Sequence, residues 1–306
     1  MGGALPGVSR IGFGCAPLGG YDYGPVDDAT SERAIAAALD AGITLFDTAD
    51  VYGLGRSESV LGRALRGRRS QAIVATKGGV AFSPDGQTRR TLAPAYLASA
   101  IDASLARLEI ERIDLYQLHW PDGVTPIADA VGAVARAVEL GKVRCIGVCN
   151  FSLEQLAEAQ AVAPVISLQV PRSLLEAQWS SAIEVAHERW GTGALCYNAL
   201  AQGYFSGKYS ASSRFSGSDL RVRSTLFSDE HQALRQVILE RLRAVADRRG
   251  VGPAHVALRW LLGQPGVAVA LCGIKTEAQA RANASAAELQ LTTDDWNCLS
   301  EVACTA

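Results

Sequence analysis

The sequence predicts an α/β protein whose fold is a closed (β/α)8 TIM barrel with extra C-terminal helices. Segments with strand character and segments with helix character alternate along almost all of the 306 residues, which is the order of a parallel sheet covered by helices. Eight β–α units follow one another without a linker, and that number favours a closed barrel over an open sheet. We therefore expect residues 1–306 to form a single domain.

Short β-prone runs bounded by Gly, Pro or Asp indicate the strands. Eight such runs are present, at residues 11–14, 44–46, 72–76, 113–118, 143–148, 165–168, 193–196 and 267–271. In a parallel α/β protein the chemistry is placed at the carboxyl ends of the strands, so we expect a pocket at that face.

Helices are predicted between the strands from apolar residues at helical spacing and from their end signals. Thr30 or Ser31 can cap the first helix and Gly42 ends it, while Pro94 suits the first turn of the third. Ser152 opens the helix after the fifth strand. Counting the first and third helices, the expected bounds are residues 30–41, 57–65, 94–108 and 127–140, with further helices near 181–190 and 277–287.

Two regions do not belong to the eightfold pattern. A long polar stretch at 210–228 is followed by extra helices near 230–249 and 253–262, and a further helix near 293–302 ends the chain. Segments of this length on a barrel are usually lids, cofactor clamps or caps at the bottom of the barrel.

Composition excludes several classes of partner. The chain is 48% hydrophobic and 20% charged, with a formal net charge of -2, so we expect neither nucleic acid nor an anionic membrane as a partner. No apolar run reaches the length of about 18 residues that a membrane span needs, and the N-terminus lacks a signal-peptide pattern.

The seven cysteines are scattered, odd in number and without a CxxC pair, which argues against a disulfide framework or a structural zinc site. They are Cys15, Cys145, Cys149, Cys196, Cys272, Cys298 and Cys304. This usage predicts a reducing compartment, and we expect the protein to be cytoplasmic.

Four polar residues lie at or just after the ends of three predicted strands: Asp47, Tyr52, Lys77 and His119. An ammonium near Tyr52 would lower the high pKa of its phenol, and Asp47 would keep Lys77 charged and oriented. His119 can donate a hydrogen bond to a carbonyl oxygen. Each of the four alone could be a cap, a surface charge or a packed core residue, but together they are suited to proton transfer.

The motifs around these residues resemble the aldo-keto reductase superfamily over nearly the whole chain. In chain order they are GFGCAPLGG, AGITLFDTADVYG, SESVLGRAL, IVATKGG, IDLYQLHWPD, GKVRCIGVCNFS, SLQVPRSLLE, CYNALAQGYFSGKY and GIKTEAQARANA. The resemblance implies hydride transfer from C4 of a nicotinamide to a carbonyl carbon, with Tyr52 as the proton donor and without a metal.

The resemblance also implies which residues hold the nicotinamide. Asn150 and Gln169 would bond its carboxamide, and Tyr197 would stack on the ring. Cys149 stands where the family usually has Ser, so one carboxamide contact is expected to be weaker. A reactive-thiol role for Cys149 is the less favoured alternative.

The cofactor phosphates need backbone N–H groups and positive charge. The family's pyrophosphate loop corresponds to Leu200, Gln202, Gly203 and Lys208. A second phosphate site is expected at Gly273, Lys275 and Thr276, where a helix begins after the last strand.

Lys275 is placed to meet a 2′-phosphate, so NADPH is the preferred cofactor, with NADH as the alternative. Gln279 and Asn283 match the adenosine contacts of the family, whereas Ala282 stands where many members carry Glu.

Aromatic residues in loops after strands are candidate walls of the substrate pocket: Tyr21, Tyr23, Phe82, Trp120 and Phe227. Ordinary packing is the alternative for each of them. Arg172 stands where the family often has an aromatic residue, and it could either pair with an anionic or hydroxyl-rich substrate or form a structural salt bridge.

Together these features predict an NADPH-dependent reductase of a small-molecule carbonyl compound: an aldehyde, a ketone or a keto-sugar. Two alternatives stay open. One is a sugar or alcohol dehydrogenase that works in the reverse direction, and the other is a cofactor-binding regulatory subunit of the channel-associated type.

Overall fold

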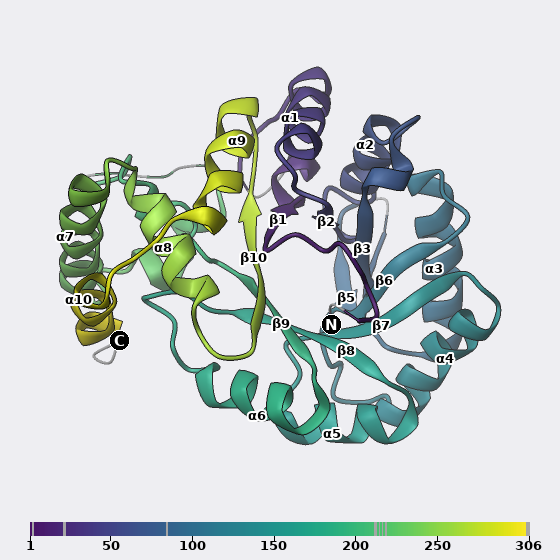
Figure 1. Ribbon diagram of the computed structural model, residues 1–306. Helices are drawn as coiled ribbons and strands as arrows, with labels where there is room; N and C mark the ends of the chain where they lie inside the picture. The colour runs from purple at the N-terminus through teal and green to yellow at the C-terminus, as the bar shows by residue number, and fades with distance from the viewer. Residues whose placement is uncertain are drawn as a thin grey trace.

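The protein is built on a closed barrel of eight parallel strands with helices around it (Figure 1). This confirms the predicted (β/α)8 fold. Around the barrel the strands are β1 (Ile11–Gly14), β2 (Leu45–Asp47), β3 (Ile73–Gly78), β6 (Ile113–Leu118), β7 (Val143–Cys149), β8 (Val165–Pro171), β9 (Gly193–Tyr197) and β10 (Val267–Gly273). β1 pairs in parallel with both β2 and β10, which closes the ring.

A computed structural model describes residues 1, 3–20, 23–83, 85–210, 213, 215, 217 and 219–303. Within those ranges, no helix is long and apolar enough to cross a membrane.

Helices α1 to α6 and α9 surround the barrel; α1 to α6 lie between successive barrel strands, and α9 follows the last strand, β10 (Figure 1). Their bounds are α1 (Asp28–Asp40), α2 (Arg56–Ala64), α3 (Pro94–Leu108), α4 (Ile127–Glu139), α5 (Leu153–Val162), α6 (Ser180–Trp190) and α9 (Glu277–Ser285). Ser152 caps α5 as predicted, in a capping box with Gln155. The cap of α1 was predicted wrongly: it is Asp27, whose carboxylate accepts a hydrogen bond from the Thr30 N–H.

The extra C-terminal helices are also present. They are α7 (Gln232–Arg249), α8 (Pro253–Leu262) and α10 (Thr293–Ala303). α8 packs on β10, α7 packs on α8, and α10 packs on α7, so these helices add layers on one side of the barrel (Figure 1).

Short elements that the sequence reasoning missed lie in the loops. β4 (Val80–Phe82) and β5 (Thr88–Arg90) form an antiparallel hairpin after β3. Short 3₁₀ helices occupy Ala16–Gly19, Arg69–Gln71, Tyr204–Ser206, Leu220–Val222, Thr225–Phe227 and Ala286–Glu288. These elements are three or four residues long, too short to show a hydrophobic period.

The barrel interior has an apolar layer, followed toward the carboxyl ends of the strands by a polar layer. Leu5 from the N-terminal segment packs inside with the apolar layer Leu45, Ala75, Leu115, Leu195, Val269 and Leu271. Because side chains in a strand alternate between two faces, the residues two positions after Leu45, Ala75 and Leu115 also face the interior and form the next layer. In this way Asp47 follows Leu45, Lys77 follows Ala75, and Gln117 follows Leu115.

Several strands run further than predicted because they continue through this polar layer. β3 extends through Lys77, β7 through Cys149, β8 through Gln169 and β9 through Tyr197. The sequence predicted ends at residues 76, 148, 168 and 196, whereas backbone pairing with the neighbouring strands holds the chain extended beyond these points. Asp47, Lys77 and Gln169 are therefore fixed on strands, whereas Tyr52 and His119 lie just after the ends of β2 and β6.

Candidate active site

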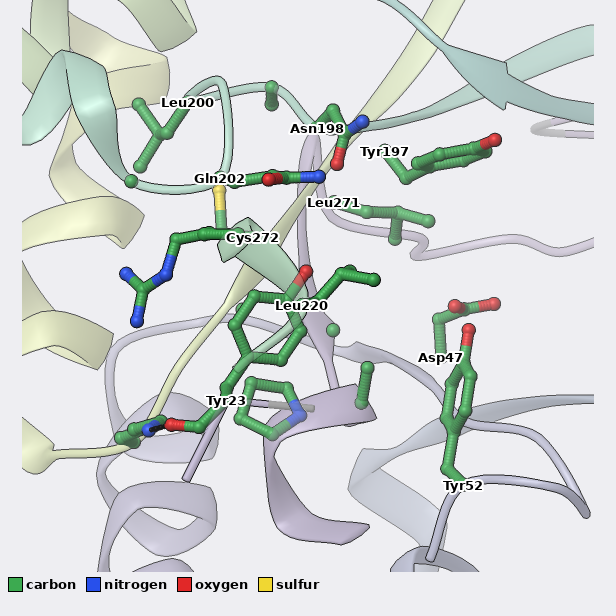
Figure 2. Close-up of a pocket in the computed structure, with 18 of the residues that line it drawn as sticks. Tyr23, Asp47, Tyr52, Tyr197, Asn198, Leu200, Gln202, Leu220, Leu271 and Cys272 are labelled. Carbon is green, nitrogen blue, oxygen red and sulfur yellow. Dashed lines mark hydrogen bonds between the residues drawn. The ribbon is translucent and has the colours of Figure 1, made fainter. Parts of the chain in front are cut away.

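A cavity of about 390 Å³ opens at the carboxyl ends of the barrel strands (Figure 2). Its walls come from the ends of β1, β2, β7, β8, β9 and β10 and from the loops that follow several strands. Figure 2 shows the Tyr52 hydroxyl pointing toward the carboxylate of Asp47 at one side, with Leu200 and Gln202 at the opposite side.

Asp47 and Lys77 form a buried ion pair beneath the cavity. Nζ of Lys77 lies 2.7 Å from Oδ2 of Asp47 and donates a second hydrogen bond to the carbonyl oxygen of Thr48 at 2.9 Å. Lys77 is fully buried, and Asp47 is 3% exposed. Burial disfavours the ammonium, but Asp47 and then Tyr52 outweigh it and raise the pKa of Lys77 above its usual value. Lys77 is therefore a fixed positive charge.

Tyr52 lies in the turn after β2, next to this pair. Its hydroxyl oxygen accepts a hydrogen bond from Nζ of Lys77 at 3.3 Å. Burial raises the pKa of Tyr52 above its ordinary value, and the charge of Lys77 offsets that rise only in part. This corrects the expectation that Lys77 would bring the pKa of the phenol below its ordinary value, and it leaves Tyr52 protonated near neutral pH.

His119 follows β6 and faces Tyr52. The two rings meet edge to face with centroids 5.9 Å apart, and the His119 ring also stacks on Trp120. Burial, with the charges of Lys77 and Arg90, lowers the pKa of His119 well below its usual value. The imidazole is therefore neutral and carries one N–H donor. Its Nδ1 is buried and has no hydrogen-bond partner among the described residues.

The Asn150 amide, predicted to meet a nicotinamide, is held in place by hydrogen bonds with Tyr197 and His119. The Tyr197 hydroxyl donates to Oδ1 of Asn150 at 2.9 Å, and Nδ2 of Asn150 donates to the carbonyl oxygen of His119 at 3.2 Å. Asn150 has a left-handed backbone with φ 61°, which Asn tolerates better than most residues. Asn150, Gln169 and Tyr197 all line the cavity.

Cys149 is part of the same contact set. Its Sγ accepts a hydrogen bond from Nδ2 of Asn150 at 3.1 Å and donates to Oε1 of Gln169 at 3.7 Å. Burial raises the pKa of the Cys149 thiol to about 12, so it stays protonated at neutral pH. Because the thiolate is the reactive form, this favours simple replacement over a reactive-thiol role.

The family model described as the aldo/keto reductase family matches residues 10–303. The chain belongs to this family. Among curated relatives, aldo-keto reductase YhdN of Bacillus subtilis is 36% identical over 291 residues, which is 94% of this chain and 88% of that protein. A Schizosaccharomyces pombe aldo-keto reductase named as using NADP(+) is 32% identical and covers 93% of this chain and 85% of its own length.

Solved aldo/keto reductase structures show the same fold. A glycerol dehydrogenase from Gluconobacter oxydans superposes with a TM-score of 0.90 at 34% identity, covering 97% of this chain and 93% of that one. An aldo/keto reductase from Klebsiella pneumoniae, solved with NADP and acetate, superposes with a TM-score of 0.73 at 25% identity, covering 96% and 91%.

Most of the residues predicted for the cofactor line one cavity in this aldo/keto reductase. Besides the residues named above, these are Leu200, Gln202, Gly203, Lys208, Gly273, Lys275 and Gln279. Thr276 and Asn283 do not line it. Thr276 instead caps α9 by accepting a hydrogen bond from the Gln279 N–H, and Asn283 is buried in that helix.

Arg221 is a cavity residue that sequence reasoning missed. It forms an ion pair with Asp219 at 2.5 Å, and its guanidinium lies 4.2 Å from the ring centroid of Phe215. Together with Lys208 and Lys275 it brings three cationic side chains to the cavity wall. The signal in the sequence is a basic residue within the polar stretch at 210–228, a segment of the kind that forms cofactor clamps.

Several predicted wall residues do not line the cavity. Tyr23 and Trp120 line it, whereas Phe82 and Phe227 do not, and Tyr21 is outside the described residues. Phe227 packs instead against Phe215, with ring centroids 4.9 Å apart, and Phe82 belongs to the β4–β5 hairpin. Aromatic residues at loop positions were therefore an unreliable guide to the pocket.

Arg172 also lies outside the cavity, which corrects both of its predicted roles. It donates hydrogen bonds to the carbonyl oxygens of Ser173 at 2.7 Å and Glu176 at 3.1 Å, and its guanidinium lies 5.1 Å from the ring centroid of Trp260. Within the described part of the chain it forms no ion pair within 4.0 Å. Arg172 therefore holds the loop after β8 by contacts with the backbone and a ring.

Proposed function

We propose that this aldo/keto reductase reduces an aldehyde, ketone or keto-sugar to its alcohol with NADPH, and that residues 1–306 act as one domain. The observation that carries this proposal is the contact of the Tyr52 hydroxyl with the buried Lys77–Asp47 pair at the wall of the cavity. When bound, the nicotinamide supplies a hydride to the carbonyl carbon. The relative named as using NADP(+) supports the choice of cofactor.

The residues present fit a dinucleotide. Oε1 of Gln202 is a buried acceptor without a partner among the described residues, and it belongs to a cavity that also holds three cationic side chains. Lys208, Arg221 and Lys275 would bind the phosphates, since positive charge offsets their desolvation. Asn150 and Gln169 would hold the carboxamide, and Tyr197 would cover one face of the nicotinamide ring.

Tyr52 would give its proton to the substrate oxygen as negative charge develops there. Its raised pKa keeps the phenol protonated near neutral pH, which suits a donor. Nζ of Lys77 lies 3.3 Å from the phenol oxygen and would stabilise the phenolate that remains, until solvent returns the proton. His119 is neutral and would donate its N–H to the same substrate oxygen, which fixes the approach of the carbonyl.

The pocket suits a small carbonyl compound. Pro17, Trp120 and Leu220 contribute apolar surface, while Tyr23 adds a ring and Tyr52 and His119 supply the polar groups. A mostly apolar wall with few polar anchors selects for shape and orientation rather than for charge.

The second candidate function is alcohol oxidation at the same site. The 34% identity and TM-score of 0.90 to a glycerol dehydrogenase favour it specifically. The cofactor-binding and catalytic residues would act from the same positions as in the reduction. Tyr52, as phenolate, would accept the proton from the alcohol. Because a raised pKa makes that phenolate scarce near neutral pH, we expect oxidation to be favoured only in alkaline solution.

Steady-state rates test both functions. The purified protein should consume NADPH with members of a panel of aldehydes, ketones and keto-sugars, and its rates with polyols and NADP should be measured in parallel. Tyr52→Phe should lower kcat by about 10²–10⁴-fold while the dissociation constant of NADPH, from fluorescence titration, stays close to that of the wild type. Unchanged turnover in Tyr52→Phe would reject the proton donor, and cofactor binding without turnover on any substrate would favour a regulatory subunit.

A further inference from the structure

Gln117 is a buried polar residue that none of the roles assigned above uses. It lies on β6, two residues before His119, and its side chain is fully buried inside the barrel. In the strand register it is paired with Lys77 of β3. It therefore belongs to the same interior layer as the ion pair.

The amide of Gln117 forms a closed set of hydrogen bonds with Asp47 and Gln169. Nε2 of Gln117 donates to Oδ1 of Asp47 at 3.0 Å, and Nε2 of Gln169 donates to the same oxygen at 2.8 Å. Nε2 of Gln169 also donates to Oε1 of Gln117 at 3.1 Å. Three strands that are far apart in sequence, β2, β6 and β8, are joined across the barrel by this set.

These contacts occupy both oxygens of Asp47. Oδ2 accepts from Nζ of Lys77, and Oδ1 accepts from the two amides. Both N–H groups of Gln169 are also used, so only its Oε1 can meet a ligand in the cavity, through the lone pair that the Cys149 thiol does not occupy. The orientation of Gln169 and the position of the Lys77–Asp47 pair are consequently set by one network.

We propose that Gln117 is a positioning residue for the reduction, which fixes Asp47 on one side and the carboxamide-binding Gln169 on the other. The proposal rests on the reductase function proposed above. Gln117 acts through these two side chains and touches neither the substrate nor the nicotinamide.

Space filling alone does not account for Gln117. A buried amide is less favourable than an apolar side chain of the same size unless its hydrogen bonds are made. The neighbouring strand leaves it room, because a Cβ at Gly147 would lie 2.9 Å from Cγ of Gln117 and 2.2 Å from Oγ of Ser167. A Leu at this position would fill similar space, so the amide is kept for its donor and acceptor.

Two substitutions at Gln117 separate positioning from packing. Gln117→Leu keeps the approximate volume but removes the donor and the acceptor, and we expect kcat to fall about tenfold. The dissociation constant of NADPH should rise several-fold, whereas KM for the carbonyl compound should change little. Ser167→Ala is the matched control, because Oγ of Ser167 is buried in the barrel without a partner among the described residues.

Gln117→Glu gives the sharper test. When the carboxyl introduced by this substitution is protonated, it retains a donor for Asp47 and an acceptor for Gln169, whereas its ionised form places a second carboxylate beside Asp47. Burial and the charge of Asp47 raise the pKa of such a carboxyl, although Lys77, the other charged group of the network, opposes the rise. Cys149, which contacts Gln169, is uncharged throughout the range tested.

The ratio of kcat for Gln117→Glu to kcat for the wild type should therefore be near one at about pH 5.5 and fall about tenfold by about pH 9. The dissociation constant of NADPH should rise over the same range. In the protein without cofactor, the variant should lose unfolding free energy relative to the wild type as pH rises, because its folded-state carboxyl has the higher pKa.

Two results would overturn the proposal: wild-type kcat and NADPH affinity in Gln117→Leu, or ratios for Gln117→Glu that do not change with pH. If Gln117→Leu fails to fold, the pH dependence of the kcat ratio for Gln117→Glu still decides. A wild-type protein without turnover on any carbonyl or alcohol would instead reject the proposed function. The pH dependence of NADPH binding and unfolding in Gln117→Glu would then still test the network.

Discussion

The hydroxyl of Tyr96 donates a hydrogen bond to Oδ2 of Asp50 at 3.1 Å in the space between α3 and the turn after β2. Asp50 is 2% exposed, and its other oxygen, Oδ1, has no partner among the described residues. Its backbone N–H donates to the carbonyl oxygen of Lys77 at 3.1 Å. Burial, and then the charge of Glu58, raise the pKa of Asp50 to about 7. Asp50 therefore ionises near neutral pH in the folded protein.

Asp50→Asn should make the protein less sensitive to pH. Because the folded-state pKa of Asp50 is raised, its contribution to stability is complete below the unfolded pKa and is lost as pH rises toward about 7. The unfolding free energy of Asp50→Asn relative to wild type should thus increase by up to about 1.4 kcal/mol per pH unit over that window. Urea denaturation of both proteins at several pH values measures this. A difference that is constant with pH would contradict it.

Lys77→Met should abolish most of the turnover. Without the ammonium, burial and the charge of Asp47 act on Tyr52 unopposed, so its pKa rises further and the phenolate left by proton transfer is not stabilised. We expect kcat to fall by about 10²–10⁴-fold. The loss should be larger for alcohol oxidation than for carbonyl reduction, since oxidation starts from the phenolate.

Lys208→Met is the control for Lys77→Met, because Lys208 is a cationic residue of the same cavity whose ammonium lies 4.9 Å from the ring centroid of Tyr209 rather than beside Tyr52. It should weaken NADPH binding but leave kcat at saturating NADPH close to wild type. Circular dichroism is needed to show that Lys77→Met is folded, because the substitution leaves Asp47 buried without its partner. A folded Lys77→Met that keeps wild-type kcat would rule out the assigned role.

Lys275→Met should change the coenzyme preference. Lys275 lines the cavity, and its Nζ donates to the carbonyl oxygen of Tyr23. If Lys275 meets the 2′-phosphate, its loss should raise the dissociation constant of NADPH by about tenfold and leave that of NADH nearly unchanged. Fluorescence titration with both coenzymes measures this, with Lys142→Met as the control, since Lys142 pairs with Asp102 at the surface. Equal losses for both coenzymes would remove Lys275 from the 2′-phosphate site.

Two ion pairs with the same N–O distance of 2.6 Å should contribute unequally to the unfolding free energy of the protein. Glu58 is fully buried; Oε2 faces Nε of Arg107, and Oε1 accepts a hydrogen bond from Thr76. Arg66 and Glu109 pair in solvent, with side chains 64% and 42% exposed. Arg107→Met should cost about 3–5 kcal/mol because it leaves a buried carboxylate unpaired, and Arg66→Met about 0–1 kcal/mol. Chemical denaturation compares them, and equal losses would show that burial is not decisive.

Much of the fold was predictable from local patterns. Pro94 and Ser152 mark helix starts by their backbone and capping chemistry, and the structure begins α3 and α5 at those points. The start of α1 was harder to predict, because several residues between 27 and 31 can cap a helix. In the structure the cap is Asp27. The β4–β5 hairpin was missed because it is short and largely exposed, so it has no hydrophobic pattern.

The sequence predicted which residues form the candidate site better than it predicted the contacts and pKa shifts of those residues. Asp47, Lys77 and His119 are polar residues at or just after strand ends, and Tyr52 follows closely, which is a signal in the chain itself. The pKa of Tyr52 was not predictable, since the sign of its shift depends on whether burial or the charge of Lys77 is larger. Arg172 was misassigned because the sequence shows its charge but not the carbonyl groups that receive its hydrogen bonds.

The sequence by itself determined the eight β–α units and the polar residues at their ends, because those depend on the period of the side chains and on nearby residues. Only the tertiary structure decided that Gln117 and Gln169 both bond one oxygen of Asp47, and that Arg221 reaches the cavity. The physical reason is barrel closure: it turns residues from β2, β6 and β8 toward one interior, and the distances across that interior depend on packing rather than on sequence separation.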